Sequence, residues 1–426
     1  MRRLIVFVVL LTPLLLMGQQ QGQNLSLKDA VNYALEYNKQ LQASRKDTEL
    51  YKKKVQEAVS QGLPQINANV AYTTNFGYKM NFGDMNVKMK DQMAAQLTVS
   101  QLIFSGQWIV GIQSAKLAEQ IANQNIKISE LGVKENILNT YYMILVYERI
   151  RDILKENVTN MEDLYTHTKN MYEAGTVEET DVDQIRINVS KLKNSLLSTE
   201  RNVEVAYSLL KLQLGMQSNQ NLQLTESLDA FLDPESYNVL SMQKFDIENN
   251  PEYQLMLSQE EVSKRTVNLG KWAYAPTISG NYGYTYKIKK PSLDMSPKHS
   301  AGITVNIPLF SGMERKSKLE QSKIELEQMS LNKSQLEDQL HLNDEQYKFE
   351  LKNAVENFQL QKDNVSVARK VFESFQKKYE YGAVSSLDLT QSNTNYLQAE
   401  SDYTQACLTL LQARVQLERL YNILPY

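Results

Sequence analysis

The stretch YEAGTVEETDV at residues 172–182 has a counterpart, YEYGAVSSLDL, at residues 379–389. Both stretches carry a Gly three residues after the Tyr and an Asp six residues after that Gly. The copies lie 207 residues apart, about half of a chain of 426 residues. A polar turn that occurs twice at this separation predicts an internal duplication of the chain.

Further matching stretches extend the duplication beyond the two turns. QLIFSGQW at 101–108 matches IPLFSGME at 307–314, and GLPQINANVAY at 62–72 matches YAPTISGNYGY at 274–284 through their prolines. The offsets are 206 residues for the FSG triplets and 212 for the prolines. Because these anchors keep their order at a nearly constant offset, we expect two halves with the same fold. We assign the halves to residues 25–215 and 250–426, joined by a linking segment at 216–249.

Residues that break helices are rare in this chain. It has 9 prolines and 16 glycines, and none of the prolines lies between Pro64 and Pro234 or between Pro308 and Pro425. Such spans predict long helices. The net charge of −3 is spread evenly, which argues against a nucleic-acid partner. The single cysteine, Cys407, excludes an intrachain disulfide and a cysteine metal cluster.

The N-terminus has the pattern of a secretory signal. Arg2 and Arg3 precede an apolar stretch that reaches Leu16. This stretch is too short for a membrane span, which needs about 20 apolar residues. We expect a signal peptide over residues 1–18, with cleavage near Gly18, and hence an exported protein. Because the only cysteine lies far from that position, we expect a mature N-terminus without a lipid.

Each half contains a long helical segment and a helix that returns along it. The helical period covers 107–172 and 178–215 in the first half, and 313–379 and 385–421 in the second, and a further helix precedes the strands in each half. The longer segments would each extend about 100 Å at 1.5 Å per residue. Alternating steps of four and three between seam residues predict a narrow coiled-coil seam in the second long helix. The seam residues are Tyr347, Leu351, Ala354, Phe358, Gln361, Val365, Ala368, Phe372, Phe375 and Tyr379.

Alternation with a period of two predicts one β-hairpin per half, at about residues 65–104 and 276–310. One face of these strands is apolar and aromatic, and the other carries Asn, Thr, Ser and Gln. The aromatic members are Tyr72, Phe76, Tyr78, Tyr282, Tyr284 and Tyr286. Polar stretches at 77–91 and 289–298 are expected to connect the strands.

The strand pattern leaves two interpretations open. The strands either form a small sheet that packs its apolar face on the helices, or they belong to a transmembrane barrel with a polar lumen. Four strands cannot close a barrel, since small barrels need about eight. A barrel would therefore require several chains that contribute four strands each.

The repeated turns have a structural explanation. Gly175 and Gly382 stand where a left-handed helix C-cap is wanted, and Asp181 and Asp388 can accept bonds from free N–H groups of the next helix. We therefore predict the tips of two antiparallel helical hairpins. An aromatic ring before each glycine indicates that something packs at the tips. These rings are Tyr172 and Tyr379, and the turns from strand into long helix are marked by Ser105, Gly106, Ser311 and Gly312.

In this order the features resemble the TolC-like outer-membrane efflux proteins, from about residue 25 to the end. LSLKDAVNYALEYNKQLQ at 25–42 looks like the opening helix of that family, and the FSG-marked hairpins, the Tyr-x-x-Gly tips and the duplication also match. The resemblance implies a mainly helical chain with transmembrane β-strands. Three copies would form a twelve-stranded barrel above a periplasmic α-helical tunnel, in the outer membrane of a Gram-negative bacterium.

The same resemblance implies a function and partners. The tunnel tip would meet a periplasmic adaptor protein, which links it to an inner-membrane pump of the RND, ABC or MFS type. The homotrimer would be the passive exit duct of a tripartite efflux or type I secretion system, in contact with outer-membrane lipid and without a cofactor. The linking segment at 216–249 would wrap around the middle of the tunnel.

The family holds its tip closed by links between neighbouring helical hairpins. Asp181 and Tyr379 match two linked positions, so we expect a hydrogen bond between them. Val384 stands where the family has an Arg, so the corresponding ion pair is lost. Asp388 matches one member of a ring of acids, whose next member is Gln391 here. The resemblance thus implies a weaker latch and a gating role for Asp388.

Two other classes of protein fit the sequence less well. An enzyme is disfavoured, because the chain has no HExxH, GxSxG or phosphate-binding loop, and its three histidines are far apart in sequence. The second alternative is an exported coiled-coil structural or adhesion protein without a pore. Two hairpins with aromatic faces argue against it, and sedimentation with the outer membrane would distinguish the two.

Overall fold

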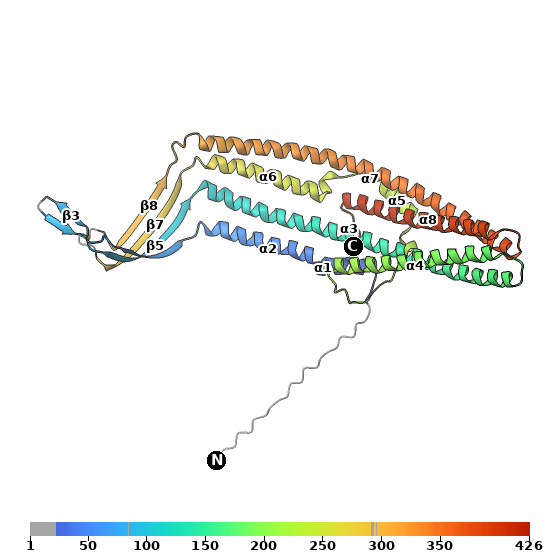
Figure 1. Cartoon of the computed structure of the whole chain (residues 1–426). Coiled ribbons are helices and arrows are strands. Elements are labelled where there is room, and N and C mark those ends of the chain that lie inside the picture. Colours follow the sequence, from blue (N-terminus) through green and yellow to red (C-terminus); the bar gives the residue numbers. More distant parts are fainter. Residues whose placement is uncertain (1–22, 84, 291–293, 295) are drawn as a thin grey trace, which may run out of the picture.

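The computed structural model describes residues 23–83, 85–290, 294 and 296–426. The expected signal peptide and its cleavage site lie outside these residues. The chain is elongated, with the main strands gathered toward one end and two helical turns at the other, and its C-terminus lies near the middle (Figure 1). The strands and the turns are thus separated by the length of the long helices.

Two long helices determine the length of the molecule. They are α3 (Gly106–Glu173) and α7 (Glu314–Glu380), of 68 and 67 residues. At 1.5 Å per residue each spans about 100 Å. α4 (Glu179–Leu214) runs back along α3, and α8 (Ser386–Leu420) runs back along α7 (Figure 1). The expectation of a mainly helical chain with long helical hairpins is confirmed.

The return helices end near the middle, where other helices continue toward the strands. α1 (Leu27–Tyr37) and α2 (Lys39–Ser60) continue from the end of α4. α6 (Pro251–Trp272) continues from the end of α8 (Figure 1). Each long helix is therefore accompanied along its length by shorter helices placed end to end.

Asn38 joins the helices of the first half. Its side-chain oxygen accepts a hydrogen bond from the N–H of Leu41 at the start of α2, at 3.0 Å. Its amide group donates to the carbonyl of Gln213 at the end of α4, at 2.7 Å. One side chain thus satisfies free backbone groups at the N-terminus of one helix and the C-terminus of another.

Asn250 performs the same two roles in the second half. Its side-chain oxygen accepts from the N–H groups of Glu252 and Tyr253 at the start of α6, and its amide donates to the carbonyl of Leu420, at 3.0 Å. The offset between Asn38 and Asn250 equals the offset between the two matching prolines. The helix junction is therefore a duplicated feature.

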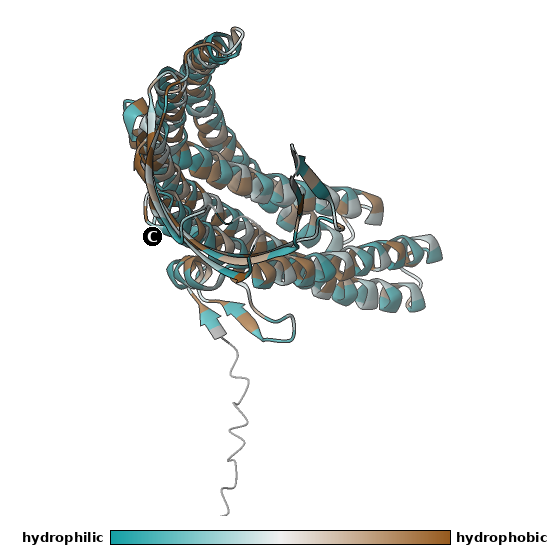
Figure 2. Cartoon of the chain, turned by 90° about the vertical axis from the view of Figure 1, so that its left-hand side faces the viewer, coloured by the Kyte–Doolittle hydropathy of each residue, from teal (hydrophilic) through white to brown (hydrophobic). Residues whose placement is uncertain are grey.

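Four strands form one antiparallel sheet in the order β2–β5–β7–β8. The strands are β2 (Gln65–Thr73), β5 (Gln92–Phe104), β7 (Thr277–Lys289) and β8 (His299–Asn306). The two hairpins are adjacent because β5 of the first half pairs with β7 of the second. The curved sheet extends the wall that the helices make (Figure 2). The prediction of four antiparallel strands is confirmed.

The connection between β2 and β5 is more ordered than expected. β3 (Lys79–Phe82) and β4 (Met85–Lys88) pair as a separate antiparallel hairpin within the stretch expected to be only a polar connection. Phe76 and Tyr78 precede this hairpin and lie outside the four-stranded sheet. Their assignment to the aromatic face of the main sheet is therefore wrong.

The largest apolar cluster lies at the middle, around the helix junctions. Buried members include Leu41, Tyr141, Leu210, Leu340 and Leu411. The segment between the halves packs there through β6 (Leu222–Leu224), η1 (Leu228–Phe231), α5 (Pro234–Met242) and η2 (Ile247–Asn249). β6 pairs in parallel with β1 (Gln23–Leu25), so this segment ties the start of the described chain to its middle.

The first FSG triplet leads directly into a helix. Ser105 is the N-cap of α3, and its hydroxyl accepts a hydrogen bond from the N–H of Trp108. Gly106 is the first residue of the helix. A Cβ atom on Gly106 would lie 2.1 Å from the ring of Trp272, so close packing requires the glycine here.

The second FSG triplet forms a different turn. Gly312 has a φ of +57° and precedes the helix, and the hydroxyl of Ser311 accepts a hydrogen bond from the guanidinium of Arg315, at 3.0 Å. α7 begins at Glu314 rather than at the expected residue 313. The two triplets mark equivalent places in the repeat but are not equivalent in conformation.

We predict that Asn250→Ala destabilises the protein by about 1–3 kcal/mol, because the buried carbonyl of Leu420 and two N–H groups lose their partner. Thermal unfolding in detergent, followed by the helical circular dichroism signal, should show a lower midpoint temperature for this variant. Asn332→Ala, at an exposed position of α7, is the control. Equal midpoints for the two variants would contradict the capping role of Asn250.

Candidate functional site

The two helical turns have the same backbone hydrogen bonds. In the first, the N–H of Gly175 donates to the carbonyl of Tyr172, and the next N–H donates to the carbonyl of Met171. In the second, the N–H of Gly382 donates to Tyr379, and the next N–H donates to Lys378. Gly175 and Gly382 have φ angles of +75° and +68°. This left-handed conformation, with its pair of bonds, closes the end of each long helix and favours glycine.

The aspartates after the two glycines begin the return helices. The N–H of Glu178 donates to Asp181 Oδ2, and the N–H of Ser385 donates to Asp388 Oδ2, both at 3.3 Å. The N–H of Asp388 donates in return to the hydroxyl of Ser385, at 3.1 Å. Helix capping therefore accounts for the Oδ2 atom of each carboxylate. Gln391 lies on the same helix and donates to Asn395, at 2.9 Å.

Two polar contacts near the tips connect the hairpins to each other. The hydroxyl of Ser386 donates to Asp181 Oδ1, and the hydroxyls of Tyr379 and Thr168 lie 3.0 Å apart. The prediction of a hydrogen bond between Asp181 and Tyr379 is therefore wrong, since each of these residues has another partner in the opposite hairpin. Burial raises the pKa of Tyr379, and the nearby charge of Asp181 adds to the rise.

The two tyrosines before the glycines differ in burial. Tyr379 is 4% exposed and belongs to an apolar cluster at the tip, whereas Tyr172 is 42% exposed. Val384, where the resemblance expects an Arg, packs against the same cluster. The tip cluster consists of Val158, Met161, Leu164, Ile185, Val189, Leu192, Phe372, Tyr379, Leu389 and Tyr396. An aromatic ring at the second tip is thus explained by packing between hairpins.

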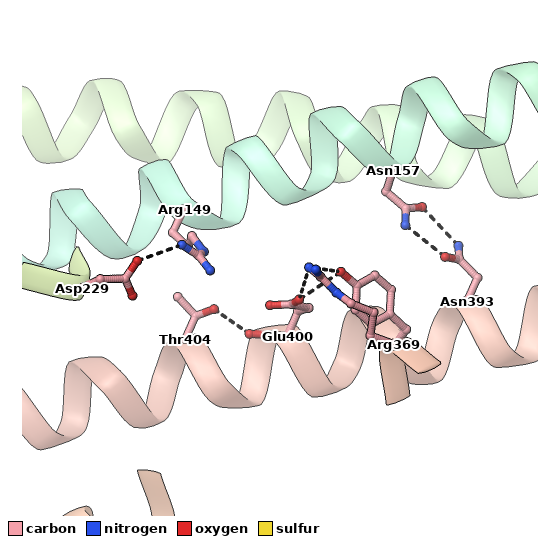
Figure 3. A network of polar contacts seen from close by, with 8 residues as sticks. Arg149, Asn157, Asp229, Arg369, Asn393, Glu400 and Thr404 are labelled. Carbon is pink, nitrogen blue, oxygen red and sulfur yellow. Dashed lines mark hydrogen bonds and ion pairs between the residues drawn. The ribbon is translucent and has the colours of Figure 1, made fainter. Parts of the chain in front are cut away.

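A line of polar contacts continues between the hairpins away from the tip. The amide of Asn188 donates to the hydroxyl of Thr390, at 2.8 Å. Farther along, Asn157 and Asn393 form two reciprocal amide hydrogen bonds of 3.0 and 3.2 Å, and both residues are buried (Figure 3). This pair was not predicted from the sequence, although an asparagine within an otherwise apolar helical stripe indicates such a contact.

Next to this pair, a buried carboxylate is bonded to one buried tyrosine and to one arginine whose side chain is exposed. Glu400 is buried, and its Oε1 atom accepts hydrogen bonds from Tyr396 at 2.9 Å and from Arg369 at 3.3 Å (Figure 3). Thr404 donates to the backbone carbonyl of Glu400. The negative charge is thus paired where it is shielded from water, as a buried charge requires.

The four-stranded sheet has one apolar face and one polar face. Directly paired residues share a face, and three rows of pairs form the apolar one. These rows are Ile66–Val99–Tyr282–Ala301, Ala68–Leu97–Tyr284–His299 and Val70–Ala95–Tyr286, with Tyr72 opposite Met93. The polar face contains the rows Asn67–Thr98–Gly283–Ser300 and Asn69–Gln96–Thr285. Tyr72, Tyr282, Tyr284 and Tyr286 therefore lie on the expected face.

The sheet is open at both sides. β2 and β8 are its outermost strands, and within the described part of the chain each has a strand neighbour on one side only. Large apolar residues such as Ile66, Val70, Ile303 and Val305 are exposed on these strands. An open edge with exposed apolar residues is a surface on which a strand of another chain can pair.

Neither a membrane-spanning helix nor a metal site is found among the described residues. No helix in the described ranges is sufficiently long and apolar to span a membrane. Among those same residues, no group of three or more His, Cys, Asp or Glu side chains is placed to hold a metal ion. The tips, the seam between the hairpins and the two-faced sheet are therefore the features from which a function can be inferred.

The sequence was compared with models of protein families and with curated proteins. The model of the family described as "Outer membrane efflux protein" matches residues 30–216 and 247–422. The probable outer membrane lipoprotein SilC of Salmonella typhimurium is 22% identical over 285 residues, which are 64% of this chain and 58% of that protein. This chain therefore matches less than two thirds of the length of that curated relative.

Solved structures share the fold over most of the chain. The outer membrane channel CmeC of Campylobacter jejuni gives a TM-score of 0.76 at 15% identity, covering 93% of this chain and 85% of that chain. The open state of the MtrE outer membrane channel of Neisseria gonorrhoeae gives 0.75 at 13% identity, covering 93% and 88%. The fold is that of an outer-membrane channel subunit.

The chain belongs to the outer membrane efflux protein family, whose members are TolC-like. Members of this family are efflux channels of the outer membrane of Gram-negative bacteria, not enzymes.

We predict that replacing one member of the buried amide pair is costlier than replacing both. Asn157→Leu or Asn393→Leu leaves a buried amide without its partner, which costs about 1–3 kcal/mol, whereas two leucines restore a matched apolar contact. Thermal unfolding in detergent should show lower midpoints for both single variants and a partial recovery in the double variant. Additive losses would contradict a direct coupling across the seam.

Proposed function

We propose that three copies of this chain form the exit duct of a tripartite efflux or type I secretion system. The single observation that carries this proposal is a sheet with one apolar and one polar face, open at both edges, placed at the end of helices about 100 Å long. Such a sheet suits a barrel wall between lipid and water. The long helices then suit a tunnel that crosses the periplasm.

The number of strands in each chain supports a barrel that is built by several copies. Four strands are too few to close around a lumen, since small barrels need about eight. Three copies supply twelve, with β8 of one copy paired with β2 of the next. The apolar face, with Tyr72 and the tyrosines of β7, then contacts lipid, and the Asn, Thr, Gln and Ser face lines the lumen.

The helical tips suit a docking site for a periplasmic adaptor protein. Tyr381 and Leu387 are 86% and 63% exposed there, and Tyr172 is partly exposed. Large apolar side chains at the far end of a hairpin are typical of protein contacts. Through that adaptor the duct would be connected to an inner-membrane pump, so the pump rather than the duct would select the cargo.

The contacts between the hairpins are proposed as the closing latch of the tunnel. Opening requires the hairpins to separate near the tip, which breaks the Ser386–Asp181 and Tyr379–Thr168 bonds. Val384 supplies apolar packing where the resemblance has a charged Arg, so the latch depends on fewer charges. Asp388 and Gln391 would face the narrow entrance, where a ring of acids favours cations.

The mature N-terminus is proposed to carry no lipid. The only cysteine in the sequence is Cys407, and it is buried in α8. The relative from Salmonella typhimurium is named a probable lipoprotein. Labelling cells with a radioactive fatty acid tests this directly, and a labelled protein would overturn it.

Particle imaging of detergent-extracted outer membranes tests the duct itself. We expect a threefold cylinder about 100 Å or more long, because the helices alone have that length. A soluble monomer, or a rod without a barrel, would contradict the proposal.

The latch is tested by the double variant Tyr379→Phe with Ser386→Ala. Each lost hydrogen bond weakens the closed state by about 1 kcal/mol, so the ratio of closed to open should fall by about thirtyfold. Recordings of single channels in planar lipid bilayers should then show more frequent or longer openings. Thr394→Ala, which removes a bond within α8 only, is the control and should conduct like the parent. Unchanged conductance of the double variant would argue against the latch.

A further inference from the structure

The charged residues of the strand region are confined to the end of the sheet that lies away from the helices. No Asp, Glu, Lys or Arg occurs in four stretches, which are residues 61–78, 92–105, 273–286 and 299–313. The two segments between them, residues 79–91 and 287–298, are called the distal segments. Together they contain seven lysines and three aspartates, a formal charge of +4, whereas the whole chain has a charge of −3.

The two distal segments lie at the same end of the molecule. The first leads from β2 to β5 and includes the β3–β4 hairpin, and the second leads from the end of β7 to β8. β5 and β7 are adjacent, with Met93 opposite Lys289. In Figure 1 the sheet lies between the helices and β3. In the proposed duct this end of the sheet lies at the outer surface of the membrane, because the helices occupy the periplasm.

The carboxylates that the structure describes in these segments have partners within the chain. Lys287 forms an ion pair with Asp294. Asp91 accepts hydrogen bonds from the hydroxyls of Tyr72 and Thr74, both at 2.9 Å. Among the described residues, four exposed lysines of the distal segments form no ion pair, namely Lys79, Lys289, Lys290 and Lys298.

Lys289 lies at the border of the apolar face. It is opposite Met93, which is opposite Tyr72, so the three share the face that we assign to lipid. Its Nζ atom is 5.4 Å from the centre of the Tyr72 ring, a distance at which a cation is attracted to an aromatic ring. The charge of Asp91 also acts on Lys289, without a direct ion pair. A cation beside an aromatic belt lies at the depth of the lipid headgroups.

The β3–β4 hairpin places like charges directly opposite each other. Lys79 is paired with Lys88, and directly opposite residues share a face, so their ammonium groups repel. Within the described part of the chain, the two strands of this hairpin pair only with each other. A two-stranded hairpin without further layers is marginally stable in water. An anion on this face would remove the repulsion, so the hairpin suits contact with an anionic surface.

We propose that the distal segments bind phosphate groups of the lipid in the outer leaflet of the outer membrane, with Lys79 and Lys289 among the contacts. This inference rests on the proposed duct and specifies the lipid that surrounds its outer end. Phosphate has the charge opposite to that of the segments, and lysine binds it as a compact point charge. Lipid phosphates also lie at the border between the apolar and the aqueous region, which is the position of Lys289.

An anionic cargo in the lumen would contact the other face of the sheet. Lys298 precedes His299, which is opposite Tyr284 on the apolar face, so Lys298 belongs to the polar face. The N–H of Thr285, a residue of the polar face, donates to the carbonyl of Lys298, at 2.8 Å. Lys298 thus has the same charge at the same end of the sheet but on the lumen side, and it provides the matched control for Lys289.

Binding of fluorescent lipid A, the phosphorylated lipid of the outer leaflet, to the detergent-purified protein tests the proposal. A lysine near an anionic membrane surface contributes a factor of about five, so Lys289→Gln should weaken binding by about that factor. The double variant Lys79→Gln with Lys289→Gln should weaken binding by at least about tenfold. Lys289→Arg keeps the charge and should bind like the parent.

The control variant Lys298→Gln should bind lipid A within about twofold of the parent. An equal loss of affinity in Lys298→Gln and Lys289→Gln would mean that only the net charge matters, and it would overturn a site on the lipid side.

Two further probes test the chemistry of the ligand. Lipid A without its phosphates should bind at least about tenfold more weakly than intact lipid A. Equal binding of the two forms would overturn a phosphate site. Inorganic phosphate that binds as tightly as lipid A would overturn the lipid as the partner.

Ion selectivity separates the lipid side from the lumen. Reversal potentials across a planar bilayer with unequal salt concentrations respond to charges that line the lumen. Lys289→Gln should leave the reversal potential unchanged, whereas Lys298→Gln should shift it toward cation selectivity. A shift for Lys289→Gln would place this residue in the lumen and overturn the proposal.

Failure of this proposal and failure of the duct give different results. Threefold particles that do not bind lipid A would overturn the lipid site and leave the duct standing. A soluble monomer would overturn both proposals.

Discussion

The length of α3 and α7 is the constraint on which the rest of the structure depends. A helix of about 100 Å cannot be covered by one compact core, so it must bury narrow stripes against neighbours along its whole length. The return helices cover only half of that distance. Further helices must therefore continue from them, and each junction exposes backbone groups that need partners. Asn38 and Asn250 satisfy those groups with one side chain apiece.

The contacts within and between the hairpins have different chemistry. Within each hairpin the turn is closed by backbone bonds to a left-handed glycine, which are strong and local. Between the hairpins, polar pairs such as Asn157–Asn393 accompany the apolar cluster. A paired amide adds little net stability but strongly disfavours a shifted arrangement, because a shift would leave buried groups unpaired. Polar pairs of this kind therefore fix the register of the two hairpins, while they add little to the free energy that is needed to separate the hairpins.

The features that local pattern determines were predictable from the sequence. Period-two alternation located the four strands, and Gly175 and Gly382 located the tips, because a positive φ favours glycine wherever it occurs. Partners across the hairpins were not predictable. Asp181 and Tyr379 were expected to bond, yet each has a partner in the opposite half of the sequence, where only the packing of the helices decides the choice. The β3–β4 hairpin was not predicted, because its two strands are short and lack a strong alternation of apolar and polar residues.

α7 carries apolar residues with two different periodicities, and only one of them is a heptad pattern. The seam residues recur about every 3.5 residues and so follow a partner that coils around the helix, as α8 does within the chain. Exposed apolar residues of the same helix, such as Ile324, Leu342 and Leu360, recur at whole numbers of turns and so lie along a straight line. The heptad pattern therefore predicts the first set of residues, whereas the second set does not fit a heptad and could not be predicted from it.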